Sequence, residues 1–75
     1  MSFLLPQTIE AMVTSARPLS IHGDLYVDLL LVPAGHEDAP VSARIAAGEC
    51  PAALQPGERV LARIVMGVVT RVDRA

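Results

Sequence analysis

Apolar and polar residues alternate with a period of two along most of this 75-residue chain. Side chains on a strand point to opposite faces in turn, so this alternation predicts β-strands with one apolar face. The longest alternating segment, Leu54 to Val72, opens with the turn residues Pro56 and Gly57 and is interrupted by Gly67. Its predicted inward side chains are Val60, Ala62, Ile64 and Met66. This segment predicts a closing pair of strands against which the rest of the chain packs.

Three shorter alternating segments predict the remaining strands, namely Thr8–Arg17, Leu25–Val32 and Val41–Ala46. Pro18 is expected to end the first strand, because proline cannot donate to a sheet ladder. A turn at His22 and Gly23 separates the first strand from the second, and a polar loop bracketed by Pro33 and Pro40 precedes the third. The predicted inward residues are Ile9, Ala11 and Val13, then Leu25, Val27, Leu29 and Leu31, then Val41, Ala43 and Ile45.

Five short strands with regular turn signals and no long amphipathic helix predict an all-β fold. Their spacing favours a small five-stranded OB-like β-barrel: a three-strand meander, a capping connection and a closing pair. The connection, Ala47–Glu58, is expected to form one helical turn over Pro51–Leu54, with Leu54 closing the end of the barrel. Residues 1–7 are interpreted as an N-terminal tail and residues 8–75 as one domain. An SH3-like barrel and a swapped β dimer are the alternatives.

The composition, 52% hydrophobic against 19% charged residues, excludes a disordered chain. Because a domain this small with so much aliphatic surface has little interior in which to bury it, we expect a homo-oligomer or a protein partner. The longest interior apolar run, Leu29–Ala34, is far below the roughly 20 residues that span a bilayer. The N-terminal segment lacks the basic region of a signal peptide. These features predict a cytoplasmic protein of a bacterium, a phage or another virus.

Residues capable of catalysis or metal binding are few. His36, Glu37 and Asp38 are adjacent in one loop, where neighbouring side chains seldom converge on one ion, so we interpret them as solvated. The single cysteine, Cys50, has no histidine partner at a suggestive spacing and is expected to be an inert thiol. The glycines are scattered and form no phosphate-binding loop. The sequence therefore predicts a non-enzymatic protein without a cofactor or metal.

Arginines are the only basic residues, six in number, in a chain of net charge −2. The strand alternation places Arg44, Arg63 and Arg71 on the outward face, together with Tyr26. Arginines that follow a phosphate backbone and an aromatic ring that stacks on a base are the means by which OB barrels hold single strands. These four residues are the predicted nucleic-acid-binding site. The alternative is that the arginines pair with outward carboxylates such as Glu10 and Asp28.

Aliphatic side chains also point outward and define a second hypothesis. The predicted contact residues of an assembly or protein-interaction module are Leu30, Val32, Leu61, Val65 and Val69. A face of this kind would support self-association that persists at high salt, because it depends on apolar burial.

The segment Val41–Gly57, with the preceding Ala39-Pro40, resembles the middle of the single-stranded DNA-binding proteins of filamentous phages, which are small OB-like dimers. Pro40-Val41 and Arg44-Ile45 match the strand of that family, and Pro51-Ala52 and Pro56-Gly57 match the connection that follows it. Tyr26-Val27-Asp28-Leu29 is similar to the preceding strand. The resemblance implies a role in coating single strands, with Arg44 and Tyr26 as contacts.

A second resemblance is to the TOBE-type domains of molybdate-handling proteins, which are also OB-like. The residues that resemble that family are Ala43-Arg44-Ile45, Leu54, Pro56-Gly57 and Val60–Ile64. This likeness implies the binding of an oxyanion such as molybdate. Both resemblances span about half of the chain.

Overall fold

A computed structural model describes residues 5–75 and shows an all-β fold. The strands are β1 (Gln7–Ile21), β2 (Asp24–Pro33), β3 (Val41–Ala46), β4 (Arg59–Val65) and β5 (Val68–Arg74), with a short 3₁₀ helix, η1 (Ala47–Glu49), after β3. They form one antiparallel sheet in the order β3-β2-β1-β4-β5. Among the described residues, no helix has the length and apolar character needed to cross a membrane.

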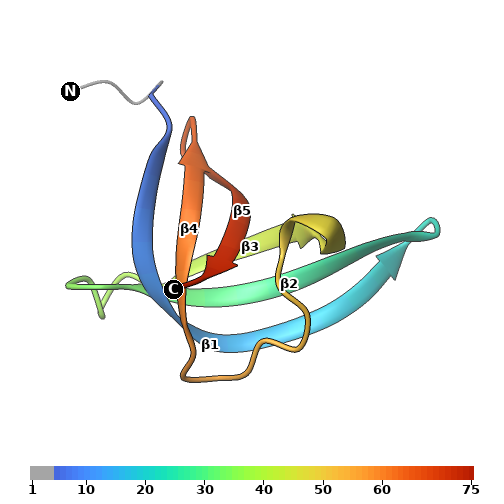
Figure 1. Cartoon of the computed structure of the whole chain (residues 1–75), viewed down its shortest axis with the longest axis horizontal. Helices are drawn as coiled ribbons and strands as arrows, with labels where there is room; N and C mark the ends of the chain where they lie inside the picture. The colour runs from blue at the N-terminus through green and yellow to red at the C-terminus, as the bar shows by residue number, and fades with distance from the viewer. Residues whose placement is uncertain (1–4) are drawn as a thin grey trace.

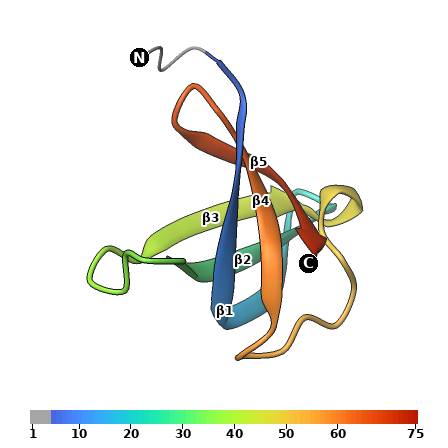
Figure 2. The same cartoon turned by 60° about the vertical axis from the view of Figure 1, so that its left-hand side comes forward.

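The long strand β1 joins the two halves of the sheet. Its first part, from Gln7 to Met12, pairs with β4, whereas the part from Ala11 to Ile21 pairs with β2. Just after the pairing with β4 ends, between Val13 and Ser15, the register with β2 shifts by one residue, so that Thr14 is an extra residue in a β-bulge. Figures 1 and 2 show the result, a β1 that runs beside β4 and then curves away along β2.

Every strand contributes to the core, which lies on the concave side of this curled sheet. The buried hydrophobic residues are Ala11, Val13, Leu29, Leu31, Ile45, Leu54, Val60, Ala62, Val69 and Val72. Leu54, in the connection between η1 and β4, is 7% exposed and joins this cluster, as predicted for the residue that closes one end. The connection is also fastened to the bulge of β1, because Val13 donates to the carbonyl of Glu58 and accepts from the N–H of Gly57.

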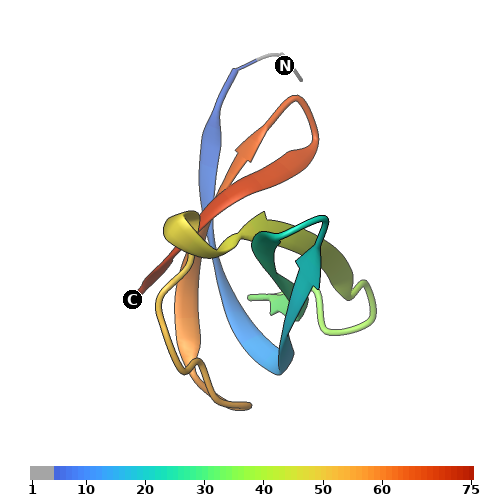
Figure 3. The ribbon, with the colours of Figure 1, turned by 90° about the vertical axis from the view of Figure 1, so that its right-hand side faces the viewer.

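The two outer strands of the sheet approach each other without pairing. β3 and β5 come within 8 Å of each other at their Cα atoms, and η1 lies beside β5. Within residues 5–75, however, β3 pairs only with β2, and β5 only with β4. Figure 3 shows the sheet curled toward closure, with η1 between the two halves. The predicted five strands are present, and the ladder that would close a barrel is not formed in this part of the chain.

The strand boundaries correct one prediction. β1 continues through Pro18, which is paired with Val27 of β2. Because β4 leaves β1 at Met12, β1 has one strand neighbour at Pro18 among the described residues, and proline fits a strand whose other edge is free. At the N-terminus, Gln7 belongs to β1 rather than to a tail. Residues 1–4 of the predicted tail lie outside the described residues.

Two residues predicted to face the core are exposed. Leu25 is 64% exposed because it lies near the tip of the β1–β2 hairpin, before β3 begins to pair with β2 at Tyr26. Met66 is 65% exposed because it occupies the tight turn between β4 and β5. The single helical turn also lies elsewhere: η1 begins at Ala47, and the predicted Pro51–Leu54 turn is not helical.

Candidate nucleic-acid interface

Three rows of side chains cross the convex face of β1, β2 and β3, on the side opposite the core. From the strand pairing, these rows are Ser15–Leu30–Ser42, Arg17–Asp28–Arg44 and Leu19–Tyr26–Ala46. Successive rows lie two residues apart along each strand, which is roughly 6.7 Å at the usual rise of an antiparallel strand. A charged row is thus flanked on one side by a leucine between two serines and on the other by a tyrosine.

The first two rows line a shallow open groove of about 590 Å³. Its walls are Ser15, Arg17, Asp28, Leu29, Leu30, Ser42, Ala43 and Arg44. Tyr26, half-buried, stands on β2 one row beyond the charged residues. The groove offers arginine forks, hydroxyl groups and apolar surface, which are the groups that proteins use to hold a phosphate backbone and its bases.

Arg44 is held by Asp28 of the neighbouring strand. Its Nε donates to Oδ1 of Asp28 at 2.8 Å and its Nη2 donates to Oδ2 at 3.1 Å, a fork-to-fork arrangement. These hydrogen bonds lower the pKa of the Asp28 carboxyl below its usual value and raise the pKa of the Arg44 guanidinium. Both side chains are substantially exposed, 53% for Arg44 and 38% for Asp28, so the pair orients the side chains more than it stabilises the fold.

Arg17 stands on the other side of Asp28, as its partner in the register of β1 and β2. Its positive charge also lowers the pKa of Asp28. Within residues 5–75, no carboxylate forms an ion pair with Arg17. Its guanidinium therefore remains available to an anion in the groove.

Arg17 was not among the predicted site residues. Beyond Val13, strict alternation puts odd-numbered residues inward, but the bulge at Thr14 reverses that order, so Ala16 packs against the core and Arg17 faces outward. The bulge at Thr14 depends on the pairing of β1 with β2 and on the hydrogen bonds of Val13 with Gly57 and Glu58. These partners are distant in the sequence, so no local pattern of residues predicts the bulge.

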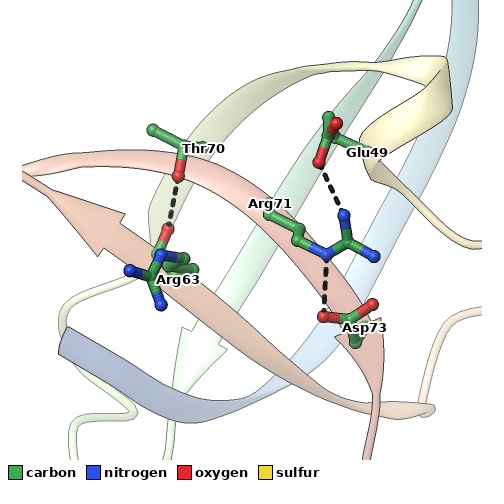
Figure 4. A network of polar contacts seen from close by, with 5 residues as sticks. All are labelled: Glu49, Arg63, Thr70, Arg71 and Asp73. Atoms are coloured by element: carbon green, nitrogen blue, oxygen red, sulfur yellow. Dashed lines mark hydrogen bonds and ion pairs between the residues drawn. The ribbon is translucent and has the colours of Figure 1, made fainter. Parts of the chain in front are cut away.

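The structure separates the four predicted binding residues into two groups. Tyr26 and Arg44 belong to the convex face of β2 and β3, whereas Arg63 and Arg71 are register partners on the β4–β5 hairpin. Figure 4 shows that Arg71 is held by two carboxylates. Its Nε donates to Asp73 at 3.1 Å and its Nη1 donates to Glu49 at 2.8 Å, and these bonds raise its pKa.

Arg63 differs from Arg71, because no carboxylate among residues 5–75 forms an ion pair with it. Its backbone carbonyl accepts a hydrogen bond from the Thr70 hydroxyl at 3.4 Å (Figure 4). The predicted alternative, that the outward arginines pair with carboxylates, is correct for Arg44 and for Arg71, although Arg71 pairs with Glu49 and Asp73 and not with the carboxylates named in the prediction. Glu10 instead pairs with Arg59, at 3.6 Å.

Val69 was predicted to lie on the outward aliphatic face and is in fact buried, with 8% exposure. The register of β4 and β5 shifts between Arg63 and Ile64, which makes Thr70 an extra residue. This bulge turns Val69 toward the core beside Ile64 while Arg71 still faces outward. Strict alternation had put both residues on the same side.

The other four predicted contact residues do not gather into one patch. Leu30 lies in the groove, and Val32 lies opposite Met12 of β1. Leu61 stands between two carboxylate residues, Glu10 on β1 and Asp73 on β5. Val65 is at the end of the β4–β5 hairpin opposite Val68, about four residues along the strand from Leu61.

The loop residues and the thiol have simple environments. Within the described residues, no three His, Cys, Asp or Glu side chains are grouped in a way that could hold a metal ion. Glu37 accepts a hydrogen bond from the N–H of Gly35 at 3.0 Å, inside its own loop. Cys50 is free and half-buried, and this burial raises the pKa of its thiol, which makes it a poor nucleophile near neutral pH.

Comparison of the chain with protein-family models, with curated proteins and with solved structures finds no match. The resemblances to filamentous-phage DNA-binding proteins and to TOBE-type domains therefore stay predictions from sequence. The case for a function depends on the geometry of the convex face.

Proposed function

We propose that this protein is a non-enzymatic, OB-like module that binds single-stranded nucleic acid. The observation that carries the proposal is the groove on the convex face of β1, β2 and β3, with Arg17 unpaired among residues 5–75, Arg44 oriented by Asp28, and Tyr26 in the next row. A cytoplasmic role in replication, in a phage or plasmid setting, follows from the sequence resemblance and belongs to the same proposal.

The strand arrangement supports the OB-like part of the proposal. An OB fold is a five-stranded, partly open barrel whose second and third strands bear the ligand-binding face. Here a three-strand meander is followed by η1 and a closing hairpin, and β3 approaches β5 to within 8 Å. The groove lies on the corresponding face, over β2 and β3 together with the adjoining part of β1.

The groove suits a flexible single-stranded nucleic acid, which can place its phosphates and its bases in different rows. The Arg17 fork would hold a backbone phosphate, since guanidinium binds phosphate in a bidentate manner. The ring of Tyr26 and the side chain of Leu30 lie on opposite sides of that charged row, where unstacked bases can rest. Unstacked bases are a property of single strands, and stacking on an aromatic side chain contributes about 1–3 kcal/mol per base.

The test is fluorescence anisotropy with a labelled oligo-dT, titrated with the full chain at several salt concentrations. We expect binding that weakens as salt rises from about 50 to about 200 mM, because phosphate contacts release counterions. Arg17→Gln should weaken binding and reduce the steepness of the salt dependence by about 0.7 for one lost phosphate contact. Tyr26→Ala should weaken binding by about 1–3 kcal/mol through loss of stacking.

Arg59→Gln is the matched control, since it removes the same charge from an exposed arginine on β4, outside the groove. The control should bind nearly as well as the wild-type chain. Absence of wild-type binding at tens of micromolar protein would overturn the proposal. If Arg63→Gln weakened binding as much as Arg17→Gln, the interface would have to extend onto the β4–β5 hairpin.

A second candidate function is self-assembly through the end of the β4–β5 hairpin. Met66 and Val68 are 65% and 62% exposed there, and Leu5, just before β1, is 65% exposed. Since Gln7 pairs with Ile64, the start of β1 lies beside the end of the β4–β5 hairpin, at one end of the sheet (Figure 1). Light scattering should then report an oligomer that persists at high salt and is lost in Met66→Ser/Val68→Ser. A monomer at all salt concentrations would exclude this candidate.

A further inference from the structure

We infer that Asp28 limits the affinity of the groove for a nucleic-acid backbone and is the residue that divides the roles of its two arginines. This inference depends on the proposed function, since it concerns the same groove. Asp28 is the central residue of the charged row, with Arg17 on one side and Arg44 on the other.

The geometry gives the two arginines different tasks. Asp28 occupies the Nε–Nη2 edge of the Arg44 guanidinium, with Nε and Nη2 at 2.8 and 3.1 Å from its two carboxylate oxygens. Arg44 therefore contributes a fixed guanidinium whose charge is largely balanced. Arg17 forms no ion pair within residues 5–75 and contributes the charge that a phosphate would meet.

Because Asp28 lies between Arg17 and Arg44, a ligand bound to either arginine also comes close to its carboxylate. Residues directly opposite each other in an antiparallel pair have Cα atoms about 4.5–5.5 Å apart, and Asp28 is opposite Arg17 and opposite Arg44. Asp28 bonds the Arg44 guanidinium directly, and the charge of Arg17 is near enough to lower the pKa of the Asp28 carboxyl, so a phosphate at either arginine also meets this negative charge. The negative charges of the phosphate and of Asp28 repel each other, and the repulsion is strongest at low salt.

The consequence is a groove with a local charge of one rather than two. A groove of this kind should bind a phosphate backbone weakly and release it easily. Removing the charge of Asp28 should free the Arg44 fork as a second phosphate ligand and relieve the repulsion. The binding should become tighter and also more dependent on salt, a signature that a purely structural role of Asp28 would not produce.

The experiment compares wild-type protein with Asp28→Asn by anisotropy on the same labelled oligo-dT, over a range of salt concentrations. Asp28→Asn is expected to bind about three- to tenfold more tightly at low salt, with a salt dependence steeper by about 0.7 for one additional phosphate contact. Glu10→Gln is the matched control, because it makes the same change of net charge beside Arg59, outside the groove. Its affinity should remain close to that of the wild type. A thermal melt of each variant checks that the fold is retained.

Equal or weaker binding by folded Asp28→Asn, while wild type binds, would overturn the inference and leave the proposed function standing. An equal gain in Asp28→Asn and Glu10→Gln would also overturn it, because net charge rather than position would then be responsible. Binding by Asp28→Asn alone, with none by wild type, would overturn the proposed function of the natural chain and, with it, this inference. Absence of binding by all three proteins would overturn the proposed function and this inference together.

Discussion

Backbone conformation at single residues explains where this chain turns. His22, Ala53 and Met66 adopt positive φ angles of 51°, 58° and 51°, a region that residues other than glycine, asparagine and aspartate seldom occupy. At Met66 the next residue, Gly67, also has a positive φ of 80°. Two successive positive φ angles define the tight hairpin turn that matches the twist of its flanking strands, and Asn-Gly is the preferred pair for it.

Met66→Asn is therefore expected to stabilise the protein. Asparagine tolerates the left-handed conformation that costs other residues about 1–2 kcal/mol, and Met66 buries little surface that could be lost. We expect the free energy of unfolding, measured with urea, to rise by about 0.5–1 kcal/mol. Met66→Val should lower it, since a β-branched residue resists this conformation. If the asparagine variant were no more stable than wild type, strain at this turn would not limit stability.

The carboxylate of Glu58 makes the stability of the fold depend on pH in the acid range. Its carboxylate accepts from the N–H of Gln55 at 2.6 Å and from Nε of Arg74 at 3.0 Å, and these bonds lower its pKa from the usual 4.5. A lowered folded-state pKa gives a contribution to stability that is present above the usual pKa and lost as pH falls through the folded value.

The melting temperature of Glu58→Gln should accordingly lie below that of wild type near neutral pH. The difference should shrink as the pH is lowered from about 6 to about 3, because wild-type Glu58 then becomes protonated as well. Thermal denaturation followed by circular dichroism at each pH measures this. A difference that stays constant over this range would contradict the proposed role of the charged form.

Among the elements, the strands were predictable and their irregularities were not. Val41–Ala46 was predicted with the boundaries that β3 has, since a short alternating segment that follows directly on a proline is a strong local signal. The bulges at Thr14 and Thr70 were missed because they arise from pairing with distant strands. One extra residue reverses the two faces of a strand. That is why Arg17 was overlooked and why Val69 was assigned to the wrong face.

The position of a hydrophobic residue along its strand decides how much it contributes to the free energy of unfolding. Leu31, in the middle of β2, is 1% exposed, whereas Leu25, near the hairpin tip of the same strand, is 64% exposed. Leu31→Ala should lower the free energy of unfolding by about 2–5 kcal/mol, through lost burial and a residual cavity. Leu25→Ala should change it by no more than about 0.5 kcal/mol. Urea denaturation of both variants provides the comparison, and similar costs at the two positions would contradict the assigned core.

At the scale of the whole molecule, the central question is how far the sheet closes in solution. β1 is flanked by β2 on one side along most of its length and by β4 on the other along Gln7–Met12. Within residues 5–75, β3 and β5 each have one paired neighbour and one free edge, although they approach within 8 Å. Amide hydrogens on a free edge exchange with water through local opening, and those within a ladder exchange only when the sheet opens.

Native-state hydrogen exchange followed by NMR distinguishes an open sheet from a closed barrel. For the open sheet, amides of β1 that donate to β2 or β4 should exchange slowly. The amides of β3 and β5 that point away from β2 and β4 should exchange faster, because they lack a strand partner within residues 5–75.

Strong protection of those outward amides in a chain shown by light scattering to be monomeric would mean that β3 and β5 pair. The OB-like barrel would then be closed, and its convex groove would be supported on a more rigid frame. Protection that appears only as the protein concentration rises would instead assign the free edges to contacts between copies of the chain.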